Sequence, residues 1–163
     1  MKIKSRHYAR RDSAKTILQE LELIFGDEIK DFMREKTLEI VKTEEQNFVF
    51  VDGEPFFFMV NGKPFPTVKG ALSVNLNKRK VVVDKGAVKF VSKGADVMCP
   101  GIVYADPKIK KDDLVIVVEE THGKALAIGR ALINGESMIA KKGKAIKTIH
   151  YVGDKIWNFE YKY

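Results

Sequence analysis

The residues best suited to bind a ligand lie in one run, Val83 to Ile102, in which small residues alternate with lysines. Lys85-Gly86-Ala87 is predicted to lead from a strand into a short helix. Because glycine and alanine carry no bulky side chain, the unpaired first amides of that helix would lie open to a phosphate, at the positive end of the helix dipole. Lys85 and Lys89 would add charge. These glycines could equally serve turns alone, but the flanking lysines favour binding.

The same run continues with a second turn at Lys93-Gly94-Ala95, where glycine suits the left-handed conformation that ends many helices. After this turn, Met98, Pro100 and Gly101 are expected to form a low surface against which a sugar or base could lie. The complete set of predicted RNA-binding residues adds one arginine and one histidine from later strands: Lys85, Gly86, Ala87, Lys89, Lys93, Gly94, Ala95, Met98, Pro100, Gly101, Arg130 and His150.

Other basic and aromatic positions allow two readings each. Arg130 could reach a phosphate or a base edge, or face solvent from its strand. His150 could stack on a base or close a barrel. The loop Lys141–Lys144 suggests a diffuse electrostatic contact. The basic segment 1–11 mixes cations with His7 and Tyr8, as RNA-facing arms do, or is a disordered end.

Catalytic and metal-binding patterns are missing from the sequence. It has no phosphate-binding loop ending in Gly-Lys-Ser/Thr, no His-Glu-x-x-His and no Gly-x-Ser-x-Gly. Cys99 is the one cysteine, and it sits in an apolar stretch that suits a small buried residue. The three histidines are scattered, so neither a metal site nor a cofactor is expected. We therefore predict a binding protein rather than an enzyme.

The charge of the chain is unevenly distributed. Its net charge is +7, and residues 77–163 hold 17 basic and 10 acidic residues, whereas residues 1–76 hold 12 of each. A basic module attracts polyanions, of which nucleic acids are the common intracellular case; a lysine-rich surface can also serve solubility alone. Neither a transmembrane segment nor an export signal is predicted, so the expected location is the cytoplasm.

The first half, residues 1–76, is predicted to form a small α+β domain. Asp12 could cap a helix whose apolar residues run from Ile17 to Phe25, and a second short helix would follow Gly26. Strands are then expected from Leu38 onward, with hairpin turns at Asp52-Gly53 and Asn61-Gly62, because both pairs tolerate positive φ angles.

The second half, residues 77–163, is predicted to be a β-barrel-like domain with one small helix over 86–92. Strands are expected at 80–83 and from Val97, and a hairpin at 114–119 and 125–133. A last hairpin would pair 145–151 with 156–161 around Gly153-Asp154. The fold class is therefore α+β, with the barrel as the basic module.

The run 83–102 resembles the opening of a PUA domain, the module named after pseudouridine synthases and archaeosine transglycosylases. More narrowly, the segments Gly53–Phe58, Pro64–Thr67 and Ile149–Trp157 look like parts of the malignant T-cell-amplified sequence family of translation factors, which ligatin also resembles. The resemblance covers roughly residues 5–160. It implies a stand-alone protein whose second domain places the strand of Arg130 near RNA.

The resemblance also implies partners. The family suggests contact with the small ribosomal subunit and with the acceptor region of transfer RNA during initiation or recycling. The acidic part of the first domain, residues 12–76 with 7 basic and 12 acidic residues, would dock a protein partner or orient the RNA-binding module; density-regulated protein is the eukaryotic example of such a partner. The alternative function is an RNA-targeting subunit that grips transfer or ribosomal RNA while a separate enzyme modifies it.

Overall fold

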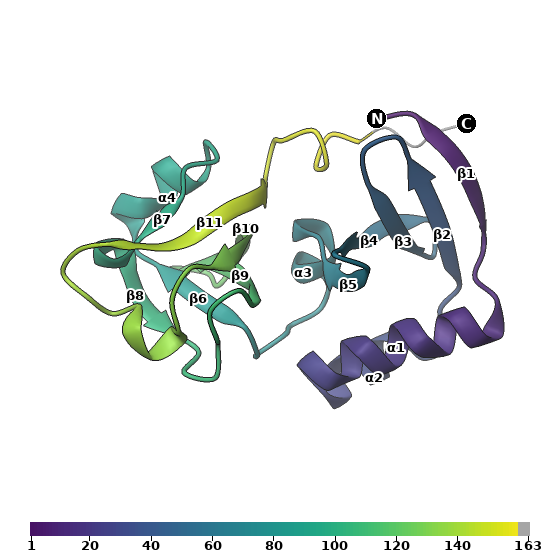
Figure 1. Cartoon of the computed structure of the whole chain (residues 1–163), viewed down its shortest axis with the longest axis horizontal. Coiled ribbons are helices and arrows are strands. Elements are labelled where there is room, and N and C mark those ends of the chain that lie inside the picture. The colour runs from purple at the N-terminus through teal and green to yellow at the C-terminus, as the bar shows by residue number, and fades with distance from the viewer. Residues whose placement is uncertain (160–163) are drawn as a thin grey trace. The chain divides into compact units, whose positions relative to one another are not determined.

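The computed structural model describes residues 1–159, which divide into two compact units (Figure 1). One unit comprises Met1–Leu76 together with Phe159, and the other comprises Asn77–Asn158. Each unit contains one sheet, flanked by short helices, so the predicted α+β class is confirmed. Within the described residues, no helix is long and apolar enough to span a membrane.

The helices of the first unit are α1 (Arg11–Phe25), α2 (Asp27–Met33) and α3 (Val68–Ser73). Ile17, Leu21 and Phe25 recur every four residues along α1 and are buried on one face, as the apolar spacing predicted. Asp12 does not cap this helix, because α1 begins at Arg11, with Arg10 at the N-cap position. The Asp12 carboxylate instead lies in the first turn, where its negative charge interacts favourably with the positive end of the helix dipole.

The sheet of the first unit has the order β1-β2-β3-β4-β5, with every neighbouring pair antiparallel. Asp52, Gly53, Asn61 and Gly62 all have positive φ, so the two predicted hairpin turns are confirmed. The strands are β1 (Ile3–Tyr8), β2 (Leu38–Thr43), β3 (Asn47–Val51), β4 (Glu54–Val60) and β5 (Lys63–Pro66).

The basic segment at the start of the chain forms β1 and pairs with β2, so the alternative of a disordered end is wrong. Arg6 is not available to a ligand: its Nε and Nη2 donate to the Glu39 carboxylate at 2.7 and 3.1 Å. Its guanidinium also lies 5.0 Å from the centre of the Phe50 ring. The Arg6 hydrogen bond and charge hold the pKa of Glu39 below its ordinary value.

The second unit is built on a six-stranded sheet in the order β7-β11-β10-β9-β6-β8, in which β6 and β9 are parallel. The two edge strands are joined by a 3₁₀ turn, η1 (Cys99–Gly101), so the sheet curves into a nearly closed barrel. Its elements are β6 (Lys80–Val83), α4 (Lys85–Val91), β7 (Val97–Met98), β8 (Ile102–Ala105), β9 (Leu114–Glu119), β10 (Ala125–Ala131), η2 (Gly135–Ser137) and β11 (Lys144–Tyr151).

The core of this barrel is filled by aliphatic side chains that alternate along the strands, among them Val81 and Val83 of β6 and Val115 and Val117 of β9. Cys99 is buried in the same core and forms no disulfide, which confirms its expected role as a small packed residue. The core therefore supports η1 and β8 from within, directly beneath the predicted binding run.

The predicted last strand is wrong over 156–159, where no strand forms; residues 160 and 161 lie outside the described part of the chain. The segment after β11 folds into turns instead, because the Asp154 carboxylate accepts hydrogen bonds from the Tyr151 and Trp157 amides at 3.0 and 2.9 Å. Phe159 then belongs to the first unit, where its ring stacks on Phe48 with centroids 5.3 Å apart.

Candidate nucleic-acid interface

An open groove of about 630 Å³ lies on the second unit, between α4 and the segment formed by β7 and η1. Phe90 and Met98 line it and are 58% and 47% exposed, which is unusual for large apolar side chains. Such surfaces can pack against the faces of bases or sugars. The predicted residues that the structure brings together here are Gly86, Ala87, Ala95, Met98, Pro100 and Gly101.

Small residues are required where α4 meets η1. A Cβ atom added to Gly101 would lie 2.8 Å from the Ala87 Cβ, closer than carbon atoms pack. The Asp84 amide also donates to the Gly101 carbonyl at 2.9 Å, which joins the start of the helix to the turn. The glycine and alanine of the sequence run therefore serve close packing that shapes the groove.

Two of the first amides of α4 have acceptors within the protein, in contrast to the open helix start that the sequence predicted. Asp84 is the N-cap residue, and its Oδ1 accepts a hydrogen bond from the Ala87 amide at 2.9 Å. The Glu120 Oε1 accepts from the Lys85 amide at 3.3 Å. Two carboxylates thus occupy the helix start and would repel an anion there.

Three predicted lysines lie beside the groove rather than in it. Lys85, Lys89 and Lys93 are exposed and spaced by four residues, so along α4 and the turn that follows they run down one side. The Lys89 ammonium lies 5.2 Å from the centre of the Phe90 ring. The lysines therefore supply positive charge next to the apolar wall, as phosphate contacts would need.

Lys144 brings a further cation directly into the groove lining. Its Nζ lies 3.0 Å from an Asp96 carboxylate oxygen, and the other Asp96 oxygen accepts from the Thr148 amide at 3.0 Å. Burial alone would raise the pKa of Asp96, but the hydrogen bonds from Lys144 and Thr148 and the charges of Lys144 and Lys147 hold it below its ordinary value. Asp96 therefore stays ionised and fixes the position of Lys144.

The structure separates the remaining predicted residues from the groove. His150 is 1% exposed, and its Nδ1 lies 2.9 Å from an Asp154 oxygen, so its ring is not at the surface, where the predicted contact with RNA would need it. Arg130 pairs in register with Lys147 and donates from Nη1 to the Asp112 carbonyl at 2.9 Å. Gly94 has a φ of +87°, as predicted for a left-handed turn, and packs against the Tyr151 ring.

Sequence reasoning missed Phe90, Asp96 and Lys144 as groove residues. The helical spacing could have identified Phe90, since it follows Gly86 by four residues and therefore lies on the same face of the helix. The sequence indicated Lys144 less clearly, because it belongs to the basic loop Lys141–Lys144, which was expected to make only diffuse contacts. Among residues 1–159, no three histidine, cysteine or acidic side chains gather to hold a metal ion.

Comparisons with known proteins agree with this geometry. The PUA domain model matches residues 79–152, and a model described as a domain of unknown function (DUF1947) matches residues 5–73. A solved structure of a hypothetical protein from Pyrococcus horikoshii has a TM-score of 0.86 and 36% identity, and the alignment covers 94% of this chain and 98% of that one. The second unit is therefore a PUA domain.

Sequence relatives extend over both units. An uncharacterized protein of Methanocaldococcus jannaschii is 46% identical over 161 residues, covering 98% of this chain and 99% of the relative. Translation machinery-associated protein 20 of Saccharomyces cerevisiae is 34% identical, covering 82% and 78%. Human malignant T-cell-amplified sequence 2 is 33% identical, covering 76% and 71%.

The chain belongs to the family of PUA-domain proteins that includes translation machinery-associated protein 20 and the malignant T-cell-amplified sequence proteins. The expected family is thereby confirmed. RNA binding related to translation is the function that this membership and the PUA domain support.

Proposed function

We propose that this protein acts in translation in the cytoplasm as a non-enzymatic RNA-binding protein. Its PUA domain would contact transfer RNA or ribosomal RNA on the small ribosomal subunit during initiation or recycling. The observation that carries the proposal is the open apolar groove between α4 and η1, flanked by exposed lysines. The first domain would dock a protein partner.

The groove supports RNA rather than a small apolar ligand because lysines lie both beside its apolar wall and, at Lys144, in its lining. Phe90 and Met98 offer exposed apolar surface, while Lys89 and Lys144 supply charge beside it. An unstacked base or sugar can lie on the apolar wall while its phosphates meet the lysines. A two-part surface of this kind holds the RNA backbone and one or two unpaired nucleotides at the same time.

The charge of the whole domain supports the same conclusion. Residues 77–163 carry the entire net charge of +7, although Asp84 and Asp96, which lie just before and after α4, also line the groove. Of the carboxylates at the groove, Asp84 is used as a helix cap and Asp96 pairs with Lys144. Since Lys144 is paired in this way, Lys85, Lys89 and Lys93 are the groups left to meet an incoming polyanion.

The test is binding of labelled total transfer RNA at two salt concentrations, by the wild type and by a Phe90→Ser/Met98→Ser variant. We expect the wild type to bind with steep salt dependence and the variant to bind at least tenfold more weakly, because each lost stacking contact contributes about 1–3 kcal/mol. Both replaced side chains are exposed, so the fold should be retained.

A matched control replaces two exposed apolar residues outside the groove, Leu23→Ser and Ile139→Ser, and should bind as the wild type does. Equal weakening in both variants would contradict the groove as the site. Co-sedimentation with small ribosomal subunits follows: association with a single RNA-modifying enzyme instead of the subunit would favour the alternative function of an RNA-targeting subunit.

A further inference from the structure

A cavity of about 490 Å³ opens on the first unit, where the end of β1 and the first half of α1 meet the connection between α2 and β2. Its apolar lining consists of Ala14, Leu18, Met33 and Leu38. Met33 is buried, and the other three are half-buried, so apolar surface is left open at this place. A cavity of this size and lining can take one large apolar side chain.

The segments around this cavity are joined by hydrogen bonds between residues distant in sequence. The Ala9 amide donates to the Leu38 carbonyl at 2.9 Å, which connects the end of β1 with the start of β2. The Asp52 Oδ1 accepts from the Thr37 amide, and the Asp52 amide donates to the Thr37 carbonyl, both at 2.9 Å. The cavity is therefore preformed, and a ligand would not have to order these segments when it binds.

Tyr8 lines the cavity and is 72% exposed, so most of its ring is not covered by the rest of the chain. Tyrosine is enriched at protein–protein interfaces, because its ring offers a large contact area and its hydroxyl a hydrogen bond. The ring consequently extends the apolar lining of the cavity onto the surface.

Two exposed cations of α1 also line the cavity, Arg11 and Lys15, and their spacing of four residues places them on one face of the helix. Within residues 1–159, no ion pair joins either of them to a carboxylate. Asp12 follows Arg11 but does not line this cavity, and its Oδ1 accepts from the Ser13 amide at 2.9 Å. Arg11 and Lys15 are therefore open to an anion.

Lys36 adds a third cation from the segment after α2. Its Nζ lies 3.8 Å from an Asp52 carboxylate oxygen and 5.3 Å from the centre of the Phe32 ring. An exposed ion pair at this distance is weak, so Lys36 keeps most of its attraction for a further carboxylate. Cations from two separate segments thus surround the apolar lining.

The charge of this cavity is opposite to that of the sequence around it. Residues 12–76 hold 7 basic and 12 acidic residues. A long polyanion such as RNA would be repelled by those carboxylates wherever it extended beyond the cavity, whereas a short acidic segment meets the three cations alone. Charge complementarity therefore favours a protein segment as the occupant.

We infer that this cavity is the docking site for a short acidic segment of a partner protein. Carboxylates of the segment contact Arg11, Lys15 and Lys36, while one large apolar side chain enters the cavity beside Tyr8. The inference rests on the proposed function, in which the first domain docks a protein partner, and it names the chemistry of that contact. The partner supplies acidic residues even though the domain is itself acidic over most of its length.

The test selects peptides from a random displayed library on three full-length proteins in parallel: the wild type, the cavity variant Arg11→Glu/Lys15→Glu, and the control Lys42→Glu/Lys63→Glu. The control makes the same change of charge at exposed residues outside the cavity, and thermal unfolding confirms that each variant is folded. Peptides that bind the basic second unit are recovered on all three proteins. We expect the peptides that the cavity variant alone fails to recover to carry acidic residues beside a leucine, methionine or aromatic residue.

Fluorescence anisotropy with one selected peptide then separates the charges from the apolar lining. Arg11→Glu/Lys15→Glu should weaken its binding about tenfold or more, because attraction becomes repulsion. Ala14→Leu, which fills the cavity without a change of charge, should weaken it to a similar extent. The matched control Gln19→Leu adds the same side chain at an exposed position of α1 outside the cavity and should bind as the wild type does.

The inference fails if no group of peptides distinguishes the cavity variant from the control, or if the distinguishing peptides lack acidic residues. It also fails if the cavity variant loses affinity for transfer RNA that the control keeps, because the cavity is then an RNA contact. If the wild type binds no RNA while acidic peptides depend on the cavity, the proposed RNA binding fails and the docking site stands.

Discussion

At the scale of single residues, Asp84 decides what the start of α4 can bind. The pattern Lys85-Gly86-Ala87 suggested open amides, but the residue before it is a good N-cap and closes them. A carboxylate that satisfies its own helix also repels a phosphate. The RNA surface that we propose consequently lies along the side of α4 and not at its end.

Asp84→Ala should lower the free energy of unfolding by about 1 kcal/mol, because the Ala87 amide loses its acceptor. Asp84→Asn should stay close to the wild type, since asparagine caps equally well. Urea unfolding at neutral pH measures both. Neither variant should bind transfer RNA more weakly than the wild type; a large loss of affinity in Asp84→Asn would mean that the carboxylate itself takes part in binding.

Asp154 determines the conformation of the segment after β11, because its carboxylate is hydrogen-bonded to the His150 ring and to two backbone amides. Burial alone would raise its pKa, but the hydrogen bonds from His150 and from the amides of Trp157 and Tyr151 lower it. With the folded pKa below the ordinary value of 3.8, ionised Asp154 stabilises the fold above about pH 4. That contribution is lost as the pH falls through the folded pKa.

Asp154→Asn should therefore destabilise the protein by about 2 kcal/mol at pH 7, where charge-assisted hydrogen bonds are replaced by neutral ones. Below pH 4 the wild type loses the same contribution, so the difference between the two proteins should shrink. Urea unfolding across this pH range measures it. A difference that stays constant down to pH 3 would show that Asp154 acts through packing alone.

At the scale of elements, the groove depends on the contact of α4 with η1. Gly101 and Ala87 let the two approach until no further carbon atom fits between them. The helix contacts the turn at this point, while the side chains of Phe90 and Met98 are exposed. Groove shape is thus set by two small residues and groove chemistry by the larger residues around them.

Gly101→Ala should lower the free energy of unfolding by about 1–3 kcal/mol, because its Cβ would lie 2.8 Å from that of Ala87. Ala87→Gly removes the opposing atom, at the usual cost of about 0.5–1 kcal/mol for glycine in a helix. The double variant should then be more stable than the sum of the two single losses predicts. Additive losses, measured by urea unfolding, would locate the strain of Gly101→Ala elsewhere.

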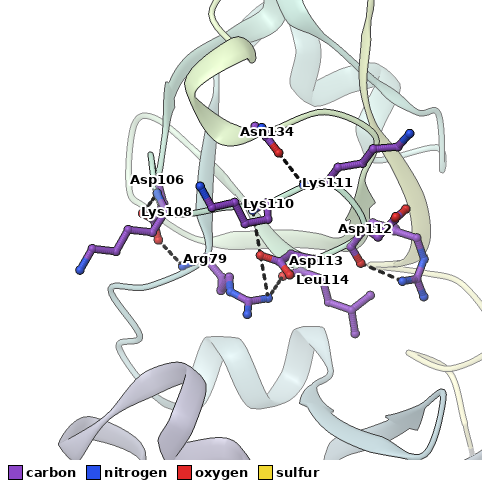
Figure 2. A network of polar contacts seen from close by, with 10 residues as sticks. Arg79, Asp106, Lys108, Lys110, Lys111, Asp112, Asp113, Leu114 and Asn134 are labelled. Atoms are coloured by element: carbon purple, nitrogen blue, oxygen red, sulfur yellow. Dashed lines mark hydrogen bonds and ion pairs between the residues drawn. The ribbon is translucent and has the colours of Figure 1, made fainter.

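At the scale of the whole molecule, the described chain forms two units, and Phe159, which follows the second unit in sequence, belongs to the first. The basic PUA unit carries the groove and the loop 106–113 with its three lysines (Figure 2). The first unit is stabilised partly by Phe159, which is 4% exposed and contacts the rings of Phe48 and Phe50. Phe159, although it follows the PUA domain in sequence, is therefore a part of the first unit's core.

Phe159→Ala should destabilise the first unit by about 3–4 kcal/mol, since a buried aromatic ring is removed from a packed site. Hydrogen exchange should show faster exchange in β3 with little change in β9 and β10. The control Phe90→Ala removes an equal but exposed ring and should cost under about 0.5 kcal/mol. Equal loss of protection in both sheets would mean that the two units unfold as one.

The sequence alone was enough for most of the elements, because these depend on local patterns. The four-residue spacing of Ile17, Leu21 and Phe25 predicts a helix, and Asp-Gly and Asn-Gly predict tight hairpins whatever surrounds them. The resemblance carried by the run 83–102 gave the PUA domain and half of the groove residues. Those residues are close in sequence, and the turn that joins them brings them together.

Tertiary structure alone decided which side chains that are distant in sequence contact one another, and which polar side chains are buried. Arg6 and Glu39 are 33 positions apart, so their pairing, which ends the reading of segment 1–11 as a free arm, could not be read from either segment. His150 is polar and aromatic, and only the fold shows that it is buried against Asp154. Lys144 and Asp96 are likewise distant in sequence, and they meet at the groove because β11 pairs with β7, the strand that follows Asp96.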